Sequence, residues 1–404
     1  MRIALAFGVC LLGGLAGTLL AAAADTDTAK TTTAKAKIAE AIAQTESSAQ
    51  RIRERYRAQL NDNTVTIMAG SGQGTDSAIV QDLAAVLDDG AALRVVPMGG
   101  KGPAHNLKDV MFMRGVDMGI TQANVLKHFA KTGELGPNLE SQVAYIAKLF
   151  NEEMHVLVRA DITDVAALDG KTVNIGIEGS GAEITARSVF NALGVTVQEV
   201  HLDEAAALAK LKAGAIDATV IIAGKPAPIL AHLEPSSGLK LLGLPYLKGL
   251  EDDYYPAALG HDDYPQLIAD GDRVDTVAVC AVLVSFNWAR NNPRNVKIDR
   301  FVERFFSNFD AFLAPPRHPK WRQVNFAATL EGWQRSPAAQ AWIDRAKATV
   351  AANAGIEESA DDGARARFDT FLAQADTGAA AASDDERARL FRAFLEWSRT
   401  QNQN

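Results

Sequence analysis

After residue 63 the sequence alternates between short apolar runs and helix-forming stretches, joined by polar or glycine-rich loops. The first runs and loops are TVTIMA then GSGQGTD (64–76), LRVVPM then GGKGPAHN (93–106), and VDMGIT then QAN (116–124). Apolar runs of this length are typical of strands, and a helix after each run allows its neighbours to be parallel. The pattern therefore predicts an α/β fold with a parallel sheet whose polar loops gather at the carboxyl ends of the strands.

The alternation starts again after about residue 160. KTVNIGI (171–177) is followed by GSGAEITARSVFNALG (179–194), a predicted helix whose last residue, Gly194, suits a helix C-terminus. IDATVIIA (216–223) is a further strand, and VAVCAVLVSF (277–286) is long enough to return to the first unit. A chain of 404 residues exceeds one ordinary core, so we predict two α/β units.

The N-terminus predicts export. Met1-Arg2 is a short basic start, residues 3–20 are apolar, and Ala21–Ala24 offers small residues for cleavage, which is the pattern of a secretory signal peptide. We predict cleavage near Ala24 and a periplasmic location. The alternative is a retained membrane anchor, because the apolar stretch approaches the ~20 residues of a spanning helix. Cys10 lies in this segment, which leaves Cys280 without a partner for an internal disulfide.

Composition and motifs argue against several other classes. The formal net charge of −8 disfavours nucleic acid and anionic membranes as partners. The glycine loop at 176–181 has the spacing G-x-x-G-S-G, which is not a dinucleotide fingerprint, and no Lys-Ser/Thr follows it. The histidines lack metal-ligand spacing, and Ser180 does not lie in a G-x-S-x-G elbow. We predict no cofactor, no metal and no enzymatic activity.

The order of these motifs resembles the TAXI family, the extracytoplasmic solute-binding subunits of TRAP transporters. The resemblance covers residues 63–290 and is carried by GSGQGTDSA, GGKGPAHNL, DMGITQANV, LDGKTVNIGIEGSGAEITARSVFNALG and GAIDATVIIAGKPAPIL. It implies a two-lobed type II periplasmic binding protein fold with a ligand cleft between the lobes and two crossover strands near 150–160 and 270–280. Apolar residues at helical spacing in 38–60 and 387–398 predict accessory helices at the two ends, which that fold does not require.

The resemblance and the alternation together divide the chain into six parts. They are a signal peptide (1–24), a polar leader with an accessory helix (25–62), the first part of lobe 1 (63–155), lobe 2 (156–274), a return to lobe 1 with a helical region (275–350), and a C-terminal helical extension (351–404).

The predicted ligand site consists of loop tips from both lobes, because helix N-termini attract anions and glycines let a ligand approach the backbone. Its residues are Ser71, Gly72, Gly74, Thr75, Asp76, Gly99, Gly100, Lys101, Asn106, Thr121, Gln122, Asn124, Gly179, Ser180, Gly181, Glu183, Ala223, Gly224 and Pro226.

Several of these residues have a second interpretation. Ser180 and Glu183 form an S-x-x-E capping box, so Glu183 either caps its helix or contacts the ligand. Asn106 either binds the ligand or braces its own loop, and Lys101 is either a cation for a carboxylate or a solvated lysine. The family commonly has tyrosines where this chain has Asp76 and Ser77, Gly-Gly-Ser where it has Lys101, and Asp where it has Asn124. These differences suggest a different ligand from the family's amino acids.

The predicted function is a periplasmic receptor that binds a small organic anion, an amino acid or a carboxylic acid, and delivers it to a separate TRAP-type membrane permease. The alternative is a sensor or assembly partner of the same fold that acts through its terminal helices.

Overall fold

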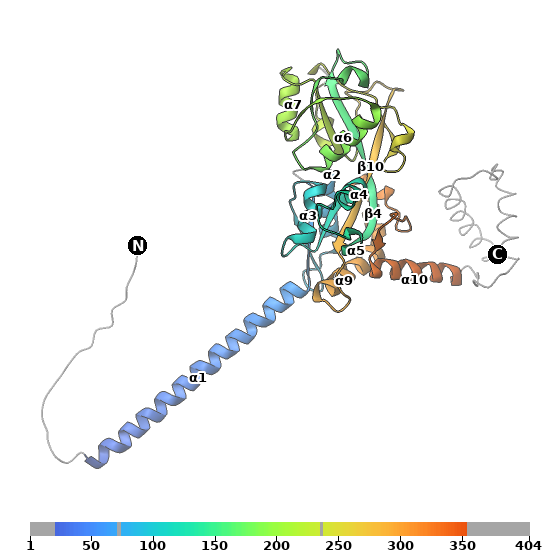
Figure 1. Cartoon of the computed structure of the whole chain (residues 1–404). Coiled ribbons are helices and arrows are strands. Elements are labelled where there is room, and N and C mark those ends of the chain that lie inside the picture. Colours follow the sequence, from blue (N-terminus) through green and yellow to red (C-terminus); the bar gives the residue numbers. More distant parts are fainter. Residues whose placement is uncertain (1–20, 71–73, 235–236, 354–404) are drawn as a thin grey trace. The chain divides into compact units, whose positions relative to one another are not determined.

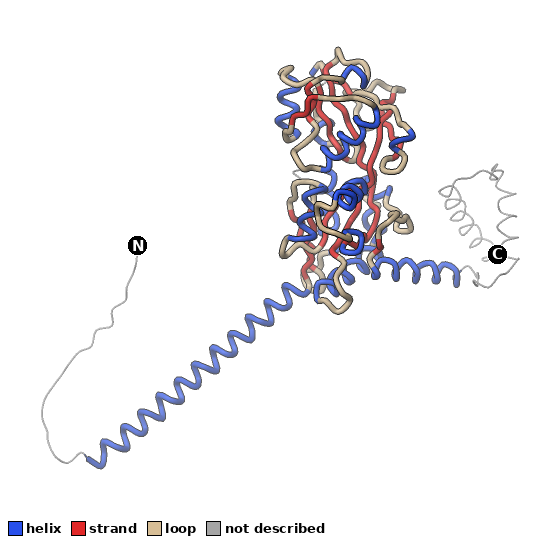
Figure 2. Tube along the Cα trace, in the orientation of Figure 1, coloured by secondary structure: helices blue, strands red, loops and turns tan. Residues whose placement is uncertain are grey.

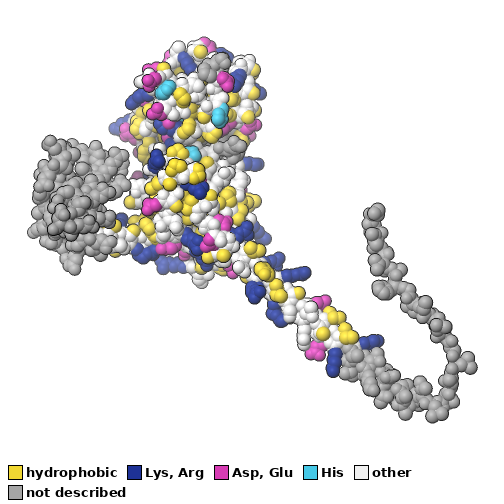
Figure 3. All heavy atoms as spheres, turned by 180° about the vertical axis from the view of Figure 1, so that it is seen from behind, with side chains coloured by type: hydrophobic (Ala, Val, Ile, Leu, Met, Phe, Trp, Pro, Cys, Tyr) yellow, Lys and Arg dark blue, Asp and Glu magenta, His cyan; other side chains and the backbone are white. Residues whose placement is uncertain are grey.

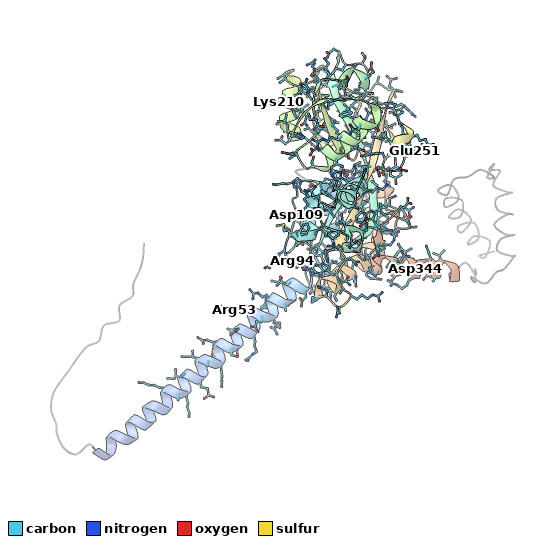
Figure 4. All side chains as sticks on the ribbon, viewed as in Figure 1. Arg53, Arg94, Asp109, Lys210, Glu251 and Asp344 are labelled. Atoms are coloured by element: carbon cyan, nitrogen blue, oxygen red, sulfur yellow. The ribbon has the colours of Figure 1, made fainter. Side chains whose placement is uncertain are left out.

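The structure, a computed structural model, describes residues 21–70, 74–234 and 237–353. The chain divides at Asp62 into two units, and the first is a single helix, α1 (Ala21–Asp62). Lysine and arginine side chains alternate with apolar ones along this helix (Figure 3), and Arg53 projects from it into solvent (Figure 4). The apolar residues Ile38, Ile42, Ile52, Tyr56 and Leu60 are 49–59% exposed.

The second unit, from Asn63, contains the sheet and the other helices. Its strands are β1 (Thr64–Met68), β2 (Arg94–Met98), β3 (Met118–Gln122), β4 (Val143–Arg159), β5 (Thr172–Asn174), β6 (Gln198–Val200), β7 (Ala218–Ala223), β8 (Leu239–Leu241), β9 (Tyr255–Gly260), β10 (Arg273–Phe286) and β11 (Gln334–Arg335).

Helices follow most of these strands, as the alternation predicts. They are α2 (Thr75–Leu87), α3 (Pro103–Phe112), α4 (Ala123–Thr132), α5 (Leu139–Gln142), α6 (Gly181–Leu193), α7 (Glu204–Lys212), α8 (Pro228–Ala231), α9 (Pro293–Ser307) and α10 (Pro337–Asn353), with the 3₁₀ turns η1 (Val165–Leu168), η3 (Lys248–Leu250), η4 (Phe309–Phe312) and η5 (Pro319–Gln323).

The strands are hydrogen-bonded in the order β2-β1-β3-β10-β4-β7-β5-β6. β1 is parallel to β2 and β3, and β5 is parallel to β6 and β7, whereas β4 and β10 are antiparallel to their neighbours. Figures 1 and 2 show β4 and β10 as long strands that run through both halves of this unit. The sequence prediction of an α/β, two-lobed fold with two crossover strands is confirmed.

The crossing points of β4 and β10 define the lobes. In β4, Phe150 packs in a core with β1 and β3, whereas Met154 packs in a different core with β5 and β7. In β10, Val279 belongs to that second core and Ala281 to the first. We therefore define lobe 1 as residues 63–153 and 280–353, and lobe 2 as residues 154–279. Figure 4 labels Arg94, Asp109 and Asp344 on lobe 1, and Lys210 and Glu251 on lobe 2.

Local sequence sets the boundaries of the helices that face the crossing. α6 begins after Ser180, whose hydroxyl accepts a hydrogen bond from the Glu183 N–H (3.2 Å), and it ends at Gly194 in the left-handed conformation (φ 70°). α4 likewise ends at Gly133 (φ 67°). α4 follows β3 directly in lobe 1, and α6 follows β5 in lobe 2 after the loop 175–180.

Aromatic residues after residue 297 form part of the core of lobe 1. Phe305 makes edge-to-face contacts with Phe312, Trp321 and Phe326, and Phe306 stacks on Phe326. The described part of the chain contains no helix that is both long enough and apolar enough to cross a bilayer. Residues 1–20 of the predicted signal peptide and residues 354–404 of the predicted C-terminal extension lie outside the described residues, whereas residues 21–24 form the start of α1.

Candidate functional site

A cleft of about 690 Å³ lies where β4 and β10 cross between the lobes. Lobe 1 lines it with the loops after β1 and β2, the end of β3 and Glu152 of β4. Lobe 2 lines it with the loop between β5 and α6, with β7, and with residues of α7 and α8. The lining residues from lobe 1 are Gly70, Gly74, Thr75, Asp76, Lys101, Gly102, Pro103, Gln122 and Glu152; those from lobe 2 include Asn174, Gly176, Ile177, Ser180, Gly181, Ala182, Leu202, Asp203, Glu204, Ala223 and His232. This volume suits a small organic molecule.

Three helices begin at the cleft. α2 and α3 start after Gly74 and Gly102, neither of which caps its helix with a side chain, and α6 starts after Ser180. The first intrahelical hydrogen bonds are donated by Ala78, Asn106 and Ile184. The N–H groups before those residues have no partner within their helices, and each helix N-terminus carries a partial positive charge. The arrangement can hold a carboxylate or another small anion.

Two acidic side chains form the floor of the same cleft. Asp76, at the start of α2, is 5% exposed, and Glu152, on β4 at the crossing, is 4% exposed. Burial raises the pKa of Asp76 from 3.8 to about 7. Burial also raises the pKa of Glu152 well above its ordinary value, and the charge of Asp76 raises it further. Each carboxyl therefore favours its own protonated, uncharged form unless a cation is bound beside it.

Gln122 connects these acids to lobe 2. It is 1% exposed, and its amide Nε2 donates a 2.7 Å hydrogen bond to Oε2 of Glu152. Gln122 Oε1 and Asp76 Oδ1 are buried and have no hydrogen-bond partner in the described part of the chain. A β-carbon added at Gly181 would lie 2.6 Å from Gln122 Oε1 and 3.2 Å from Pro103. The glycine at the start of α6 therefore permits the two lobes to approach each other at this point.

A separate ion pair lies next to the floor. The Lys320 ammonium from η5 donates to both carboxylate oxygens of Glu153, at 2.6 and 2.9 Å, and the N–H of Lys225 donates to the same carboxylate at 2.8 Å. Burial raises the pKa of Glu153, although the Lys320 charge opposes that shift. Burial lowers the pKa of Lys320, and Glu153 opposes this change. The charge of Lys320 is therefore committed to Glu153.

Hydrogen bonds join the lobes beside the cleft. The Thr75 hydroxyl donates to the carbonyl of Gly224 (3.0 Å), and the Asn124 amide donates to the hydroxyls of Thr185 (2.8 Å) and Tyr254 (3.1 Å). Lys127 forms an ion pair with Asp253 at 2.7 Å. These contacts hold α4 of lobe 1 against α6 and the 252–254 loop of lobe 2.

A second hollow, of about 910 Å³, lies among α4, α6 and the 252–254 loop. It is larger than the cleft, and six of its charged groups are held in the pairs Lys108–Glu134, Lys127–Asp253 and Arg187–Glu183. Its lining also contains a buried atom without a hydrogen-bond partner in the described residues, Asn124 Oδ1. We place the candidate site in the cleft because α2, α3 and α6 all begin there and two acceptors that lack a donor in the described part of the chain, Asp76 Oδ1 and Gln122 Oε1, belong to its lining.

The structure brings part of the predicted site together. The predicted residues that line the cleft are Gly74, Thr75, Asp76, Lys101, Gln122, Ser180, Gly181 and Ala223. Ser71 and Gly72 lie outside the described residues. The lining does not include Gly99, Gly100, Asn106, Thr121, Asn124, Gly179, Glu183, Gly224 and Pro226.

Several predicted residues outside the lining have structural partners. The Asn106 amide donates to the Ile120 carbonyl (2.8 Å), which ties α3 to β3 rather than bracing its own loop, and the Thr121 hydroxyl donates to the Pro103 carbonyl (2.9 Å). Gly100 is a close-approach position, because an added β-carbon would lie 2.1 Å from Asn106 Oδ1. Glu183 accepts from the Gly179 N–H and pairs with Arg187, which is the capping interpretation.

Glu152 is the principal lining residue that the sequence prediction missed. Its signal was the Glu152-Glu153 pair inside the apolar run of a crossover strand, where side chains on both faces are expected to be apolar. Lobe 2 also supplies the unpredicted residues Asp203, Glu204 and His232. Among the ionisable residues of the lining, Asp76, Glu152, Asp203 and Glu204 therefore outnumber the single lysine, Lys101.

The described residues include one group with metal-ligand chemistry, formed by Glu183, Glu199 and His201, whose ligand atoms lie within 4.8 Å of one another. Arg187 forms ion pairs with both glutamates. Its guanidinium already supplies the positive charge that these carboxylates need, so we do not assign a metal to this group.

Comparison with known proteins identifies the family. Similar solved structures include the periplasmic binding protein BugD (13% identity, covering 73% of this chain and 98% of that one, TM-score 0.44). Others are the alkanesulfonate-binding protein SsuA from Xanthomonas axonopodis pv. citri bound to MOPS (15%, 71% and 93%, TM-score 0.41) and a TctC solute-binding protein from Polaromonas (18%, 61% and 87%, TM-score 0.35). The model of the NMT1-like family matches residues 67–287, which is more than half of the 404 residues, and the chain therefore belongs to the NMT1-like family.

Proposed function

We propose that this protein is an exported receptor that binds a small organic anion, an amino acid or a carboxylic acid, in the cleft between its lobes. It delivers this ligand to a TRAP-type membrane permease on a separate chain, as its resemblance to the TAXI family implies. The observation that carries the proposal is the convergence of the N-termini of α2, α3 and α6 on one cleft. N–H groups and helix dipoles at three helix starts favour a carboxylate.

The two-lobed architecture supports capture and release. Only β4 and β10 carry the main chain between the lobe cores. The hydrogen bonds and ion pairs that join the lobes near the cleft include those of Thr75, Asn124 and Lys127, and the bond from the Lys225 N–H to Glu153. A ligand that contacts both lobes stabilises the closed arrangement, in which the two lobes lie against each other. Binding then changes the surface that the two lobes jointly present to a permease.

Binding fits the chemistry of the cleft better than catalysis does. The Ser180 hydroxyl accepts the capping hydrogen bond of α6 from the Glu183 N–H. Cys280 is buried, and burial raises the pKa of its thiol to about 11, so the thiolate that nucleophilic chemistry requires is disfavoured.

A thermal-shift screen tests the proposed ligand class. Because a ligand that binds only the native state stabilises it by RT ln(1 + [L]/Kd), an excess of one hundred over Kd contributes about 2.7 kcal/mol. We expect a rise in the melting temperature with amino acids or carboxylic acids of low molecular mass. A screen in which neutral sugars alone raise the melting temperature would contradict the proposal.

A sensor or assembly partner is the second candidate function, and α1 favours it. This helix has 42 residues, and its apolar side chains at 38, 42, 52, 56 and 60 are exposed. Size-exclusion chromatography with light scattering, run on the full chain and on a chain without residues 25–62, tests this function. A mass that drops to that of one chain only in the shortened form supports it, whereas one chain per particle in both forms counts against self-assembly through α1.

A further inference from the structure

The polar atoms left without partners on the cleft floor are hydrogen-bond acceptors. Asp76 Oδ1 and Gln122 Oε1 are buried, and neither has a donor within the described residues. The carboxylate of Glu152 accepts one bond there, from Gln122, through Oε2. A buried acceptor without a donor is energetically unfavourable, so this floor favours a ligand that brings N–H or O–H donors.

The three side chains come from three different elements that meet at this place. Asp76 begins α2, Gln122 ends β3, and Glu152 lies in β4 one residue before the position where β4 pairs with both β7 and β10. All three line the cleft. Gln122 is not acidic, and its unpartnered Oε1 is therefore an independent indication that a donor is expected at the floor.

The local charge identifies the donor. The nearby ammonium of Lys320 is bound to Glu153 at 2.6 Å, and Lys101, the lysine in the lining, is an exposed residue. Two buried carboxyls thus share the floor with no ion-pair partner among the described residues. A bound cation would replace the protons that these carboxyls hold in the ligand-free protein, and a primary ammonium offers three N–H donors for the acceptors of Asp76, Gln122 and Glu152.

We propose that Asp76, Glu152 and Gln122 form an ammonium subsite, so that the ligand is an aminocarboxylate rather than a simple carboxylic acid. This inference rests on the proposed binding function. The ammonium lies at the floor, and the carboxylate lies toward the helix N-termini. A hydrogen bond to a charged group is worth roughly 1.5–3 kcal/mol, so the amino group contributes about tenfold or more to the affinity.

Matched ligands test the subsite by isothermal titration calorimetry on the full chain. Each set contains an amino acid, the acid without the amino group, and the amine without any carboxyl group: alanine, propionate and ethylamine; 4-aminobutyrate, butyrate and propylamine; glutamate, glutarate and propylamine. We expect the aminocarboxylate of at least one set to bind about tenfold or more tightly than the matched acid.

The outcomes separate the inference from the function on which it depends. Acids that bind as tightly as their amino partners overturn the ammonium subsite and leave the receptor function standing. Amines that bind as tightly as the aminocarboxylates support the subsite and contradict the proposed carboxylate ligand. No binding in any set contradicts both, and tight binding of sodium, magnesium or calcium chloride alone overturns the subsite in favour of a metal cation.

Variants that remove charge but keep shape provide the second test. Asp76→Asn and Glu152→Gln are each expected to lower the affinity for the aminocarboxylate about tenfold or more. Each is expected to leave the affinity for the matched acid within about twofold of its original value. Asp310→Asn is the matched control, because Asp310 is exposed on η4. Both variants are checked by circular dichroism; if one does not fold, the other still decides. If a folded variant loses affinity for the acid and for the aminocarboxylate to the same extent, the proposal of an ammonium subsite is overturned.

Discussion

At the scale of single residues, Asp76 links the cleft to the stability of the protein. Its pKa is raised by burial to about 7, and the pKa of Glu152 is raised by burial and by Asp76. Folding therefore takes up protons at these carboxyls. The stability that they contribute is complete below their unfolded pKa, near 4, and is lost as the pH rises through the native pKa. Gln122 faces the pair from β3, and Glu153 and Lys320 lie beside it.

We expect the free energy of unfolding of the ligand-free protein to fall between about pH 4 and pH 8 by a few kcal/mol. Asp76→Asn removes part of this fall, because the amide does not ionise. Urea denaturation over this pH range measures the effect, and Asp310→Asn serves as the control for one exposed carboxyl lost elsewhere. A variant whose stability changes with pH as steeply as that of the unaltered protein would contradict the assignment.

Gly181 governs the approach of the two lobes. A β-carbon there would lie 2.6 Å from Gln122 Oε1, a contact that side chains do not tolerate without a shift. We expect Gly181→Val to abolish ligand binding and to change the melting temperature of the ligand-free protein by little, because the clash lies between the lobes and not inside a core. Calorimetry and thermal unfolding measure the two effects.

Gly99→Ala is the matched control for this variant. An added β-carbon at Gly99 meets no atom within 4 Å, so binding is expected to persist. If Gly181→Val instead unfolded the protein, Gly181 would be required by the fold of α6 rather than by the meeting of the lobes.

At the scale of elements, the crossover strand β4 carries two adjacent buried acids, of which only one has a cationic partner in the described residues. Glu152 has no cationic partner in the described residues, whereas Glu153 is held by Lys320, and both side chains of that pair are less than 5% exposed. Removing one member of a buried ion pair leaves an uncompensated charge, which typically costs 3–5 kcal/mol.

We expect Lys320→Met to lower the free energy of unfolding by about 3–5 kcal/mol at neutral pH. The double variant Lys320→Met with Glu153→Gln should recover part of the loss, because the buried charge is then gone. Lys131→Met, at an exposed position on α4, is the control. Urea denaturation decides: a loss no larger than that of the control would show that the pair does not stabilise the crossing.

The elements themselves were largely predictable, because periodicity and glycine positions are local signals. The strand expected at 64–69 is β1, the helix expected to end at Gly194 is α6, and the apolar run at 277–286 returns to lobe 1 as part of β10. The crossings expected near 150–160 and 270–280 coincide with the places where β4 and β10 pass between the cores.

The site was less predictable, because the same residue types serve ligands and loops. Asn106 and Asn124 both lie near the start of a helix that follows a strand, yet Asn106 ties α3 to β3 and Asn124 joins the lobes. Glu152 faces the cleft only because β4 crosses there, and this is a property of pairing between strands distant in sequence. Local sequence gives loop positions at the cleft, whereas the identity of the groups on its floor depends on tertiary structure.

At the scale of the whole molecule, the unit from Asn63 contains all that the proposed binding function needs. Its cores include strands from both lobes and the aromatic cluster around Phe305, and its cleft is lined by residues from Gly70 to His232. The helix α1 is a separate unit that ends at Asp62. Two units with separate roles are consistent with ligand capture in one and assembly in the other.

We therefore expect a chain without residues 25–62 to keep its ligand affinity within about twofold and to keep its melting temperature, because buried apolar area within the second unit supplies the stability of the lobes.

Within α1, Ile42→Glu combined with Ile52→Glu provides a matched test that retains the helix. These substitutions place charge on the exposed apolar positions, where they would disrupt a contact with a partner but not the ligand cleft. Calorimetry and thermal unfolding on the three proteins measure affinity and stability. A shortened chain that folds but no longer binds would show that α1 takes part in ligand binding, and a large drop in its melting temperature would show that the second unit depends on α1 for its fold.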